Sequence, residues 1–234
     1  MHNNVQIMPI ARKHAPEGTP DIKRKRYSVI TADIVDSRRI ESFRPTRNSK
    51  LKELSRLHIE EKLILSPYAV TAWDEFQVIL STPVYSPRVI LDLRRLFFPL
   101  QLWIAVVMGT ASGTHREPVN VHAGGEAFER ARLAMDQLKS GSTKYRVLTC
   151  FESGDERFDT IANTVYHLQD SLLEGTTEKQ WATINMQVET GRQDLTARRL
   201  KLNISTISRN LKRGYYWHLV ETVDAMERIL KAYF

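Results

Sequence analysis

Apolar positions in the first two thirds of the chain fall into short strands and amphipathic helices. Residues 26–34 (RYSVITADI) carry apolar side chains on both faces, which predicts a central strand covered from two sides. Residues 50–64 place leucine and isoleucine at near-helical spacing among good helix formers, which predicts a helix. Residues 67–82 (PYAVTAWDEFQVILST) predict two short strands around a tight connection near residues 72–74.

Four further elements continue the pattern to residue 151. The sequence predicts helices at 86–98 and 125–140 and strands at 100–109 and 145–151. The order is then β-α-β-β-α-β-α-β, which favours one mixed sheet with helices packed mainly on one face. We therefore expect an α/β fold of the α+β kind, with a palm or ferredoxin-like mixed sheet.

From Phe158 onward the pattern is purely helical, which indicates a second unit. The boundary between the two units is placed in residues 153–158. The chain then divides into a disordered basic arm (1–25), a palm-like domain (26–155) and a helical domain (156–234).

Positive charge gathers at both ends of the chain, and the net charge is +7. Lys and Arg outnumber Asp and Glu by six to two in residues 1–28 and by ten to six in residues 177–234, whereas residues 29–176 hold eighteen against nineteen. Basic ends around a neutral body suit a protein that meets a polyanion through its termini. The alternative is a solvated tail and a basic surface without such a partner.

Targeting signals are missing from the sequence. No apolar run approaches the roughly 20 residues that a membrane helix needs, and residues 1–26 lack the apolar core of a signal peptide. Cys150 is the single cysteine, so no internal disulfide can form. We expect a cytoplasmic protein with no membrane partner.

Acidic residues follow the first predicted strand and lie in the first predicted hairpin. Asp33 ends the strand, and Asp36 lies just beyond it. If the hairpin lies beside this strand, Asp33 and Asp74 converge at one edge of the sheet. Two carboxylates so near to each other suit a divalent cation such as Mg²⁺ or Mn²⁺. The alternative is a structural role, because Asp and Ser also favour turn and cap positions. Asp36 or Ser37 would then cap a short helix.

These motifs resemble the palm-type catalytic domain of class III nucleotidyl cyclases and of diguanylate cyclases. The matching pieces are TADIVDS at a strand end, DEFQVIL at a hairpin, and the strand WIAVVMGTA followed by a helix that opens with glycine. The resemblance implies a metal site formed by Asp33, Asp74 and the Ile34 carbonyl, although Trp73 stands where those families have glycine. The candidate nucleotide contacts are Asp36, Ser37 and Glu75.

A closer resemblance, over nearly all of residues 26–215, is to the SatD family of bacterial proteins. The shared elements, in order, are ITADIVDSR, the DEFQ hairpin, GEAFERAR in a late helix, and Trp181 before a terminal helix-turn-helix. This resemblance implies a palm-like domain followed by a helical one, and it brings no established reaction.

Residues 194–213 (DLTARRLKLNISTISRNLKR) have the spacing of a helix-turn-helix. A short turn between the two helices has Ile204 tucked into it, and Ile207 and Leu211 lie four residues apart on the buried face of the second helix. A preceding helix at 179–189 would supply the third wall of a small bundle.

The opposite face of the second helix would meet DNA. Short hydroxyl side chains let a helix approach base edges, Arg209 can bind a guanine through two hydrogen bonds, and Lys212 suits a phosphate. A three-helix bundle used for dimerisation or docking is the alternative. The candidate contacts to double-stranded DNA are Ser205, Thr206, Ser208, Arg209, Lys212, Arg213, Arg198 and Arg199.

The last helical segment carries an apolar stripe. Leu219, Val223, Met226 and Leu230 follow one another at spacings of four, three and four. Such a heptad-like stripe would pair with a second copy in a homodimer, or it would cover the chain's own core.

The sequence therefore indicates a cytoplasmic regulator that binds DNA as a homodimer, with a palm-like domain that senses a nucleotide or a metal. One alternative is a metal-dependent, nucleotidyl cyclase-like enzyme whose terminal helices serve assembly. The other is a docking protein with neither activity.

Overall fold

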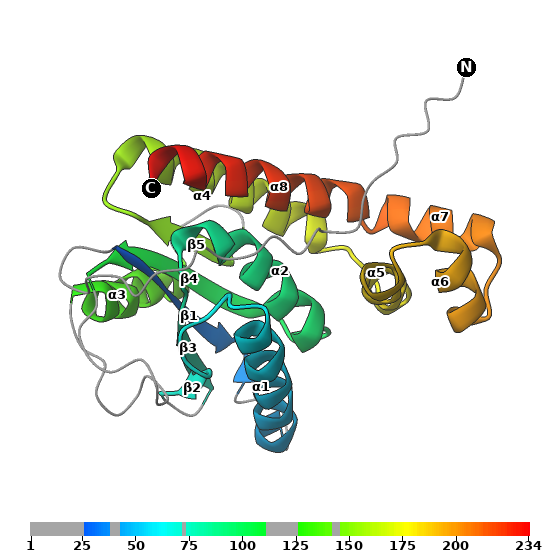
Figure 1. Ribbon diagram of the computed structural model, residues 1–234, viewed down its shortest axis with the longest axis horizontal. Coiled ribbons are helices and arrows are strands. Elements are labelled where there is room, and N and C mark those ends of the chain that lie inside the picture. Colours follow the sequence, from blue (N-terminus) through cyan, green and yellow to red (C-terminus); the bar gives the residue numbers. More distant parts are fainter. Residues whose placement is uncertain (1–25, 38–42, 72–73, 111–125, 142–145) are drawn as a thin grey trace.

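The computed structural model describes residues 26–37, 43–71, 74–110, 126–141 and 146–234 (Figure 1). The strands are β1 (Tyr27–Ile34), β2 (Ala69–Val70), β3 (Glu75–Ile79), β4 (Leu102–Gly109) and β5 (Thr149–Glu152). The helices are α1 (Phe43–Glu60), α2 (Ser86–Phe97), α3 (Glu126–Ser140), α4 (Glu156–Leu173), α5 (Glu178–Thr190), α6 (Gln193–Leu200), α7 (Ile204–Arg213) and α8 (Tyr216–Tyr233), with a 3₁₀ turn at Pro83–Tyr85 before α2. The predicted basic arm, residues 1–25, lies outside the described residues.

The five strands form one mixed sheet in the order β2-β3-β1-β4-β5. β1 is central and pairs antiparallel with β3 and β4, while β4 and β5 are parallel. All eight residues of β1 are buried, as its two apolar faces predict. The succession β1-α1-β2-β3-α2-β4 with this strand order is ferredoxin-like, and α3 and β5 extend it. The predicted α/β (α+β) class with a palm or ferredoxin-like sheet is confirmed.

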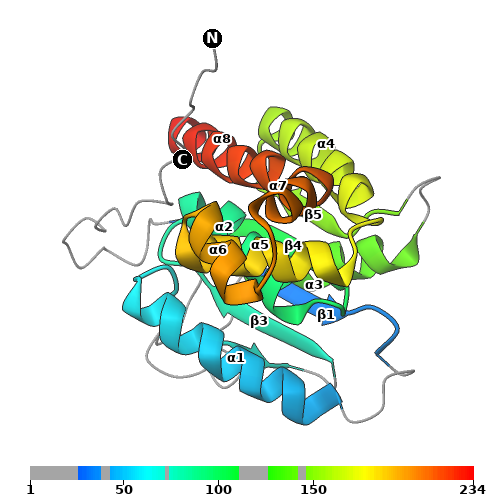
Figure 2. The same ribbon diagram turned by 90° about the vertical axis from the view of Figure 1, so that its right-hand side faces the viewer.

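The sheet is covered on both faces, by different numbers of helices. Of the helices in the described ranges, only α3 packs on one face, where Ala127 and Ala131 lie against Val29 and Val107 of the central strands. The small side chains let α3 approach closely: a Cβ added at Gly109 would lie 3.2 Å from the Ala127 Cβ. The other face carries α1, α2, α4 and α8 (Figure 2).

The first helix differs from its predicted limits of 50–64. It begins at Phe43 and ends at Glu60, and the chain then turns at Lys62, which has a left-handed φ of 58°. Ile64 pairs with Leu80 beside the sheet instead of continuing the helix. Leu63 and Ile64 are buried beside the sheet, and a helix that ran to residue 64 would bury them too. Helical spacing alone could therefore not place the C-terminal end of α1.

The C-terminal helices pack in two places. α4 and α8 lie side by side over the sheet (Figures 1 and 2). Phe158, Tyr166 and Leu230 from these helices join its core. α5, α6 and α7 form a separate cluster at one end of the molecule, which includes Leu91 of α2 and the first half of α8. The domain boundary near residues 153–158 stays a prediction.

The apolar stripe of α8 is buried inside this chain. Leu219 and Val223 belong to the α5–α7 cluster, and Met226 and Leu230 belong to the core of the sheet. Each of the four side chains is at most 2% exposed. Of the two alternatives for the stripe, the structure therefore shows the second: the stripe covers the chain's own core. Throughout the described ranges, no helix is both long and apolar enough to cross a bilayer.

Candidate functional site

Asp33 lies near the end of β1, on the face of the sheet that α3 covers. It pairs in register with Glu75 of β3 and Trp103 of β4. Its Oδ2 forms an ion pair with Nζ of Lys139, in the last turn of α3. Its Oδ1 is buried and has no hydrogen-bond partner among the described residues. The carboxyl at the end of the central strand is thus paired with an ammonium through one of its two oxygens.

Asp74 lies in the connection before β3, and the structure brings it to the same edge as Asp33. Its Oδ2 accepts a hydrogen bond from the buried Ser37 hydroxyl. Burial raises the pKa of Asp33, and the nearby negative charge of Asp74 raises this pKa further, while the hydrogen bond and positive charge of Lys139 lower it. The net direction is upward. Two carboxyls and one ammonium therefore share this edge.

The other predicted residues of this edge have separate surroundings. Ile34 is a buried strand residue. Asp36 is exposed and has a left-handed φ of 55°, a turn conformation that Asp tolerates better than most residues. The Glu75 carboxylate accepts a 2.7 Å hydrogen bond from the Thr71 hydroxyl. Trp73, which stands where the cyclases have glycine, lies outside the described residues.

A divalent cation at this edge stays a prediction. The described ranges contain no group of three or more His, Cys, Asp or Glu side chains that could hold a metal ion. Asp33 and Asp74 could supply two oxygen ligands, but a cation would compete with the Lys139 ammonium for Asp33.

Two residues of this edge were missed by the sequence reasoning. Lys139 is the ion-pair partner of Asp33, and Thr31 has a buried hydroxyl without a hydrogen-bond partner in the described part of the chain. Lys139 lies in a helix C-terminal turn, where a cation is ordinary, so its position gave no signal. Thr31 lies two residues before Asp33, hence on the same face of the strand, and this alternation could have identified it.

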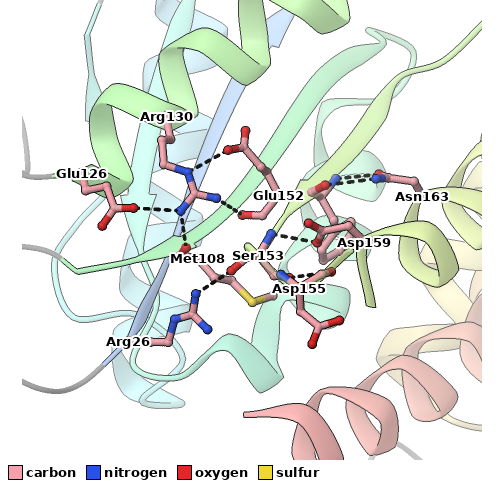
Figure 3. A network of polar contacts seen from close by, with 10 residues as sticks. Arg26, Met108, Glu126, Arg130, Glu152, Ser153, Asp155, Asp159 and Asn163 are labelled. Atoms are coloured by element: carbon pink, nitrogen blue, oxygen red, sulfur yellow. Dashed lines mark hydrogen bonds and ion pairs between the residues drawn. The ribbon is translucent and has the colours of Figure 1, made fainter. Parts of the chain in front are cut away.

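Arg130, in the GEAFERAR motif, fixes α3 to the sheet (Figure 3). Its Nε donates to Glu152 of β5 at 2.7 Å, and its Nη1 donates to the Met108 carbonyl of β4 and to Glu126, both at 3.2 Å. Nearby, Arg26 Nη2 donates to the Ser153 carbonyl at 2.7 Å. The guanidinium of Arg130 therefore holds α3 against β4 and β5.

The second predicted site lies on α6 and α7, which are joined by residues 201–203 and packed against α5. Polar pairs that are buried or partly buried tie the three helices together in addition to apolar contacts. Thr196 donates to Gln187 at 2.9 Å, joining α6 to α5. Asn210 donates to Thr183 at 3.0 Å, joining α7 to α5. Such satisfied polar pairs favour one arrangement of the helices over looser ones.

α7 has a buried apolar side and an exposed polar side. Ile207 and Leu211 are 0% exposed, as their spacing predicts. Ile204 is 54% exposed, so the prediction that it tucks into the turn is wrong. α7 begins at Ile204, and the residue stands at the open N-terminal end of the helix where no neighbouring element among the described residues covers it.

The structure exposes most of the predicted DNA contacts and half-buries one. Thr206 is the half-buried residue. Arg199 lies 3.8 Å from a carboxylate oxygen of Glu189, and this exposed pair is weak. The exposed candidates are Arg198, Arg199, Ser205, Ser208, Arg209, Lys212 and Arg213.

The α5–α7 cluster meets the body of the protein through α2 and α5. Arg95 Nε donates to Asn185 Oδ1 at 3.2 Å, and the rings of Phe98 and Trp181 stack with centroids 5.5 Å apart. Arg95 also pairs with the buried Asp92 at 2.8 Å. The junction thus combines an aromatic stack with a hydrogen-bonded ion pair.

No family model and no curated protein matches this chain. Among solved structures, the chain is similar to the crystal structure of a regulator of polyketide synthase expression from Bifidobacterium adolescentis. The identity is 13%, the alignment covers 88% of this chain and 82% of that chain, and the TM-score is 0.29. At this TM-score the likeness supports neither a shared fold nor a shared function, and membership of the SatD family stays a prediction.

Proposed function

We propose that this protein is a cytoplasmic regulator that binds double-stranded DNA through α6 and α7. In this proposal α6, residues 201–203 and α7 form a helix-turn-helix, and α7 is the helix that enters the major groove. α5 supports the pair from behind through Trp181 and Ile184, which are 4% and 1% exposed.

The two-sided character of α7 carries the proposal. Ile207 and Leu211 are fully buried, while short hydroxyl side chains and basic side chains cover the exposed side. Residues 193–213 contain six Lys or Arg and one Asp. A basic, narrow helix face with small residues at its front matches what a major groove requires sterically and electrostatically.

Each exposed residue has an expected role. Ser205 and Ser208 allow close approach to base edges, and Arg209 is placed to read a guanine. Lys212, Arg213 and Arg198 would contact phosphates, which hold the protein in register without reading sequence. As a homodimer, the protein would present two such helices to half-sites one DNA turn apart. Since α8 buries its stripe, the dimer contact would use another surface.

The palm-like domain is the second part of the proposal, as a sensor of a nucleotide or a divalent metal. The specific observation in its favour is the shared edge of Asp33 and Asp74, with one oxygen of Asp33 and the hydroxyl of Thr31 buried and unpartnered in the described part of the chain. Buried groups of this kind are candidates for a ligand or an ordered water. A cyclase-like reaction is not part of the proposal.

Duplex binding by an Arg209→Ala variant tests the DNA-binding proposal. Fluorescence anisotropy with a labelled mixed-sequence duplex would measure Kd across a salt series. We expect non-specific Kd values of about 10⁻⁴ to 10⁻⁶ M near physiological salt, which fall steeply as salt is lowered. In this non-specific mode Arg209→Ala removes one positive charge from the DNA-facing side of α7, so binding should weaken and the slope of log K against log salt should fall by about one.

The control is Arg132→Ala, which removes an exposed arginine from α3 and leaves the net charge equal to that of the first variant. A protein that binds through α7 should keep wild-type affinity in this control. Binding that is independent of salt, or an equal loss in both variants, would contradict the proposal.

A further inference from the structure

The exposed face of α4 carries large apolar side chains in one row. Ile161, Leu168 and Leu172 are 40%, 63% and 40% exposed. Their spacing of seven and four residues places them on one side of the helix, in a row about 16 Å long. Within residues 160–172, all of which the structure describes, no exposed residue is Lys, Arg, Asp or Glu.

Two other helices that cover the sheet expose charges instead. The exposed sides of α3 and α8 carry a charged residue at every third or fourth position. These residues are Glu126, Glu129, Arg132 and Asp136 in α3, and Glu221, Asp224, Arg228 and Lys231 in α8. Single exposed apolar side chains are ordinary on a protein surface, whereas a contiguous apolar patch marks an interaction site. The α4 face has the character of a contact surface.

The polar side chains of this face have already used their donors. The hydroxyls of Thr160, Thr164 and Ser171 each donate to the backbone carbonyl four residues earlier, at 2.7, 2.8 and 3.0 Å. Because these donors keep their partners when water leaves, covering the face leaves no hydroxyl hydrogen unsatisfied. The side chains are also small, so another helix can come close beside the apolar row.

The edge of the sheet next to α4 is partly closed by this helix. β5 is the edge strand, and Asn163 of α4 accepts from the Phe151 amide at 2.7 Å and donates to the Phe151 carbonyl at 3.0 Å (Figure 3). A second chain therefore cannot pair with β5 at Phe151. A partner that approaches this edge would meet α4.

The charges at the two ends of α4 indicate which partner fits. Arg157 is exposed about one turn before Ile161, and Glu174 is exposed directly after the last residue of the helix. If a second copy packs antiparallel with the middles of the two apolar rows together, Arg157 of each copy lies about 3 Å along the axis from Glu174 of the other. The rows then face each other, and opposite charges meet at both ends. Such self-complementarity is what a two-fold interface requires.

We propose that the exposed face of α4 is the homodimer contact, in which the α4 helices of two copies pack antiparallel about a two-fold axis. This inference rests on the proposed function for the expectation of a homodimer. Its test measures self-association in the absence of DNA, so a failure of the α4 contact is distinguished from a failure of DNA binding.

Analytical ultracentrifugation of the full chain, from about 1 to about 200 μM, tests the proposal. We expect a reversible dimer with a Kd on the order of 10 μM, because a contact made mainly by one helix of each copy is small. Leu168→Lys places an ammonium in the middle of the contact in both copies and should weaken the dimer at least about 10-fold. Leu133→Lys on α3 is the matched control, because Leu133 is 60% exposed, and it should keep the wild-type Kd.

Exchange of the end charges tests the antiparallel arrangement. Arg157→Glu brings carboxylates together at both ends and should weaken the dimer about 3- to 10-fold at low salt. A double variant, Arg157→Glu with Glu174→Arg, should recover the wild-type Kd. Three results would overturn the proposal: a monomer at every concentration, as when residues 1–25 or a different protein cover the face; a Leu168→Lys dimer as tight as wild type; or no recovery in the double variant.

Discussion

Lys139 places a positive charge against the buried carboxyl at the end of the central strand. The Asp33 side chain is 5% exposed, and Asp74 adds a second carboxyl at the same edge. A buried carboxylate without a partner would be strongly unfavourable, so the ammonium stabilises the ionised form of Asp33. In this structure one side chain supplies the charge that a bound cation would supply in a metal site.

We predict that Lys139→Met turns this edge into a better metal site. Without the ammonium, ionised Asp33 is buried and uncompensated, so the melting temperature at neutral pH should fall. Mn²⁺ should then raise it again by mass action, by about 1.4 kcal/mol at ten times Kd. For a chain of this size that is about 3–6 °C, and differential scanning fluorimetry measures it.

Two comparisons make the Lys139 result specific. The wild type should respond less to Mn²⁺, because the cation must displace Lys139 from Asp33. A Lys139→Met, Asp33→Asn double variant should not respond, because the carboxylate is gone. If Mn²⁺ has no effect on Lys139→Met, Asp33 and Asp74 act only as structural residues.

At the scale of elements, Gly214 sets how α7 joins α8. A Cβ added there would lie 2.9 Å from Ile184 Cδ1, 3.1 Å from the Asn210 carbonyl oxygen and 3.2 Å from Gln180 Cβ. Part of this contact is with backbone and with the base of a side chain, which cannot move away easily. The end of α7 is therefore held directly against α5.

We predict that Gly214→Ala destabilises the protein by about 1–3 kcal/mol, the range for overpacking a well-filled site. Urea denaturation followed by circular dichroism would measure the change in the free energy of unfolding. Gly175→Ala is the control, because a Cβ at Gly175 meets nothing within 4 Å, and its effect should be small. Equal stability of the two variants would show that α5 and α7 separate easily.

Much of the fold follows from local patterns in the sequence. The apolar residues on both faces of 26–34 and the helical spacing in 125–140 correspond to β1 and α3, because β1 is covered from two sides and α3 buries one face. Burial of Ile207 and Leu211 was equally predictable. These features depend on neighbours close in sequence.

What the sequence could not provide depends on distant contacts. Nothing near Lys139 indicates that it reaches Asp33, about a hundred residues earlier. The α8 stripe fits a partner helix as well as it fits this chain's own core, so only the packing decided between them. Ile204 is apolar, yet no element of the described part of the chain lies over the start of α7 to cover it.

At the scale of the whole molecule, the palm-like part and the helical part share residues. Phe158 of α4 is 0% exposed, and Leu230 of α8 is also 0% exposed, both within the core of the sheet. Leu91 of α2 belongs in turn to the α5–α7 cluster. The two predicted domains are thus joined by buried apolar contacts.

We predict that a fragment of residues 26–155 does not fold cooperatively by itself. Removing α4 and α8 exposes the apolar face that they cover, including the surroundings of Ile104 and Phe151. The fragment should bind a hydrophobic dye such as ANS and lose a sharp thermal transition, as expanded states do. A matched longer fragment of residues 26–234, which lacks only the basic arm, should melt cooperatively. A sharp transition in the short fragment would instead support the boundary predicted at 153–158.

The burial of Leu230 in the core of the sheet also affects folding of the protein during its synthesis on the ribosome. β5 ends at Glu152, about 80 residues before the part of α8 that closes this core. At about 5–20 residues per second, the part of the sheet's apolar face that α8 covers is synthesised roughly 4 to 16 seconds before α8 is complete. We expect a chaperone at the ribosome to bind this apolar surface during that interval and to be displaced when α8 packs onto the sheet.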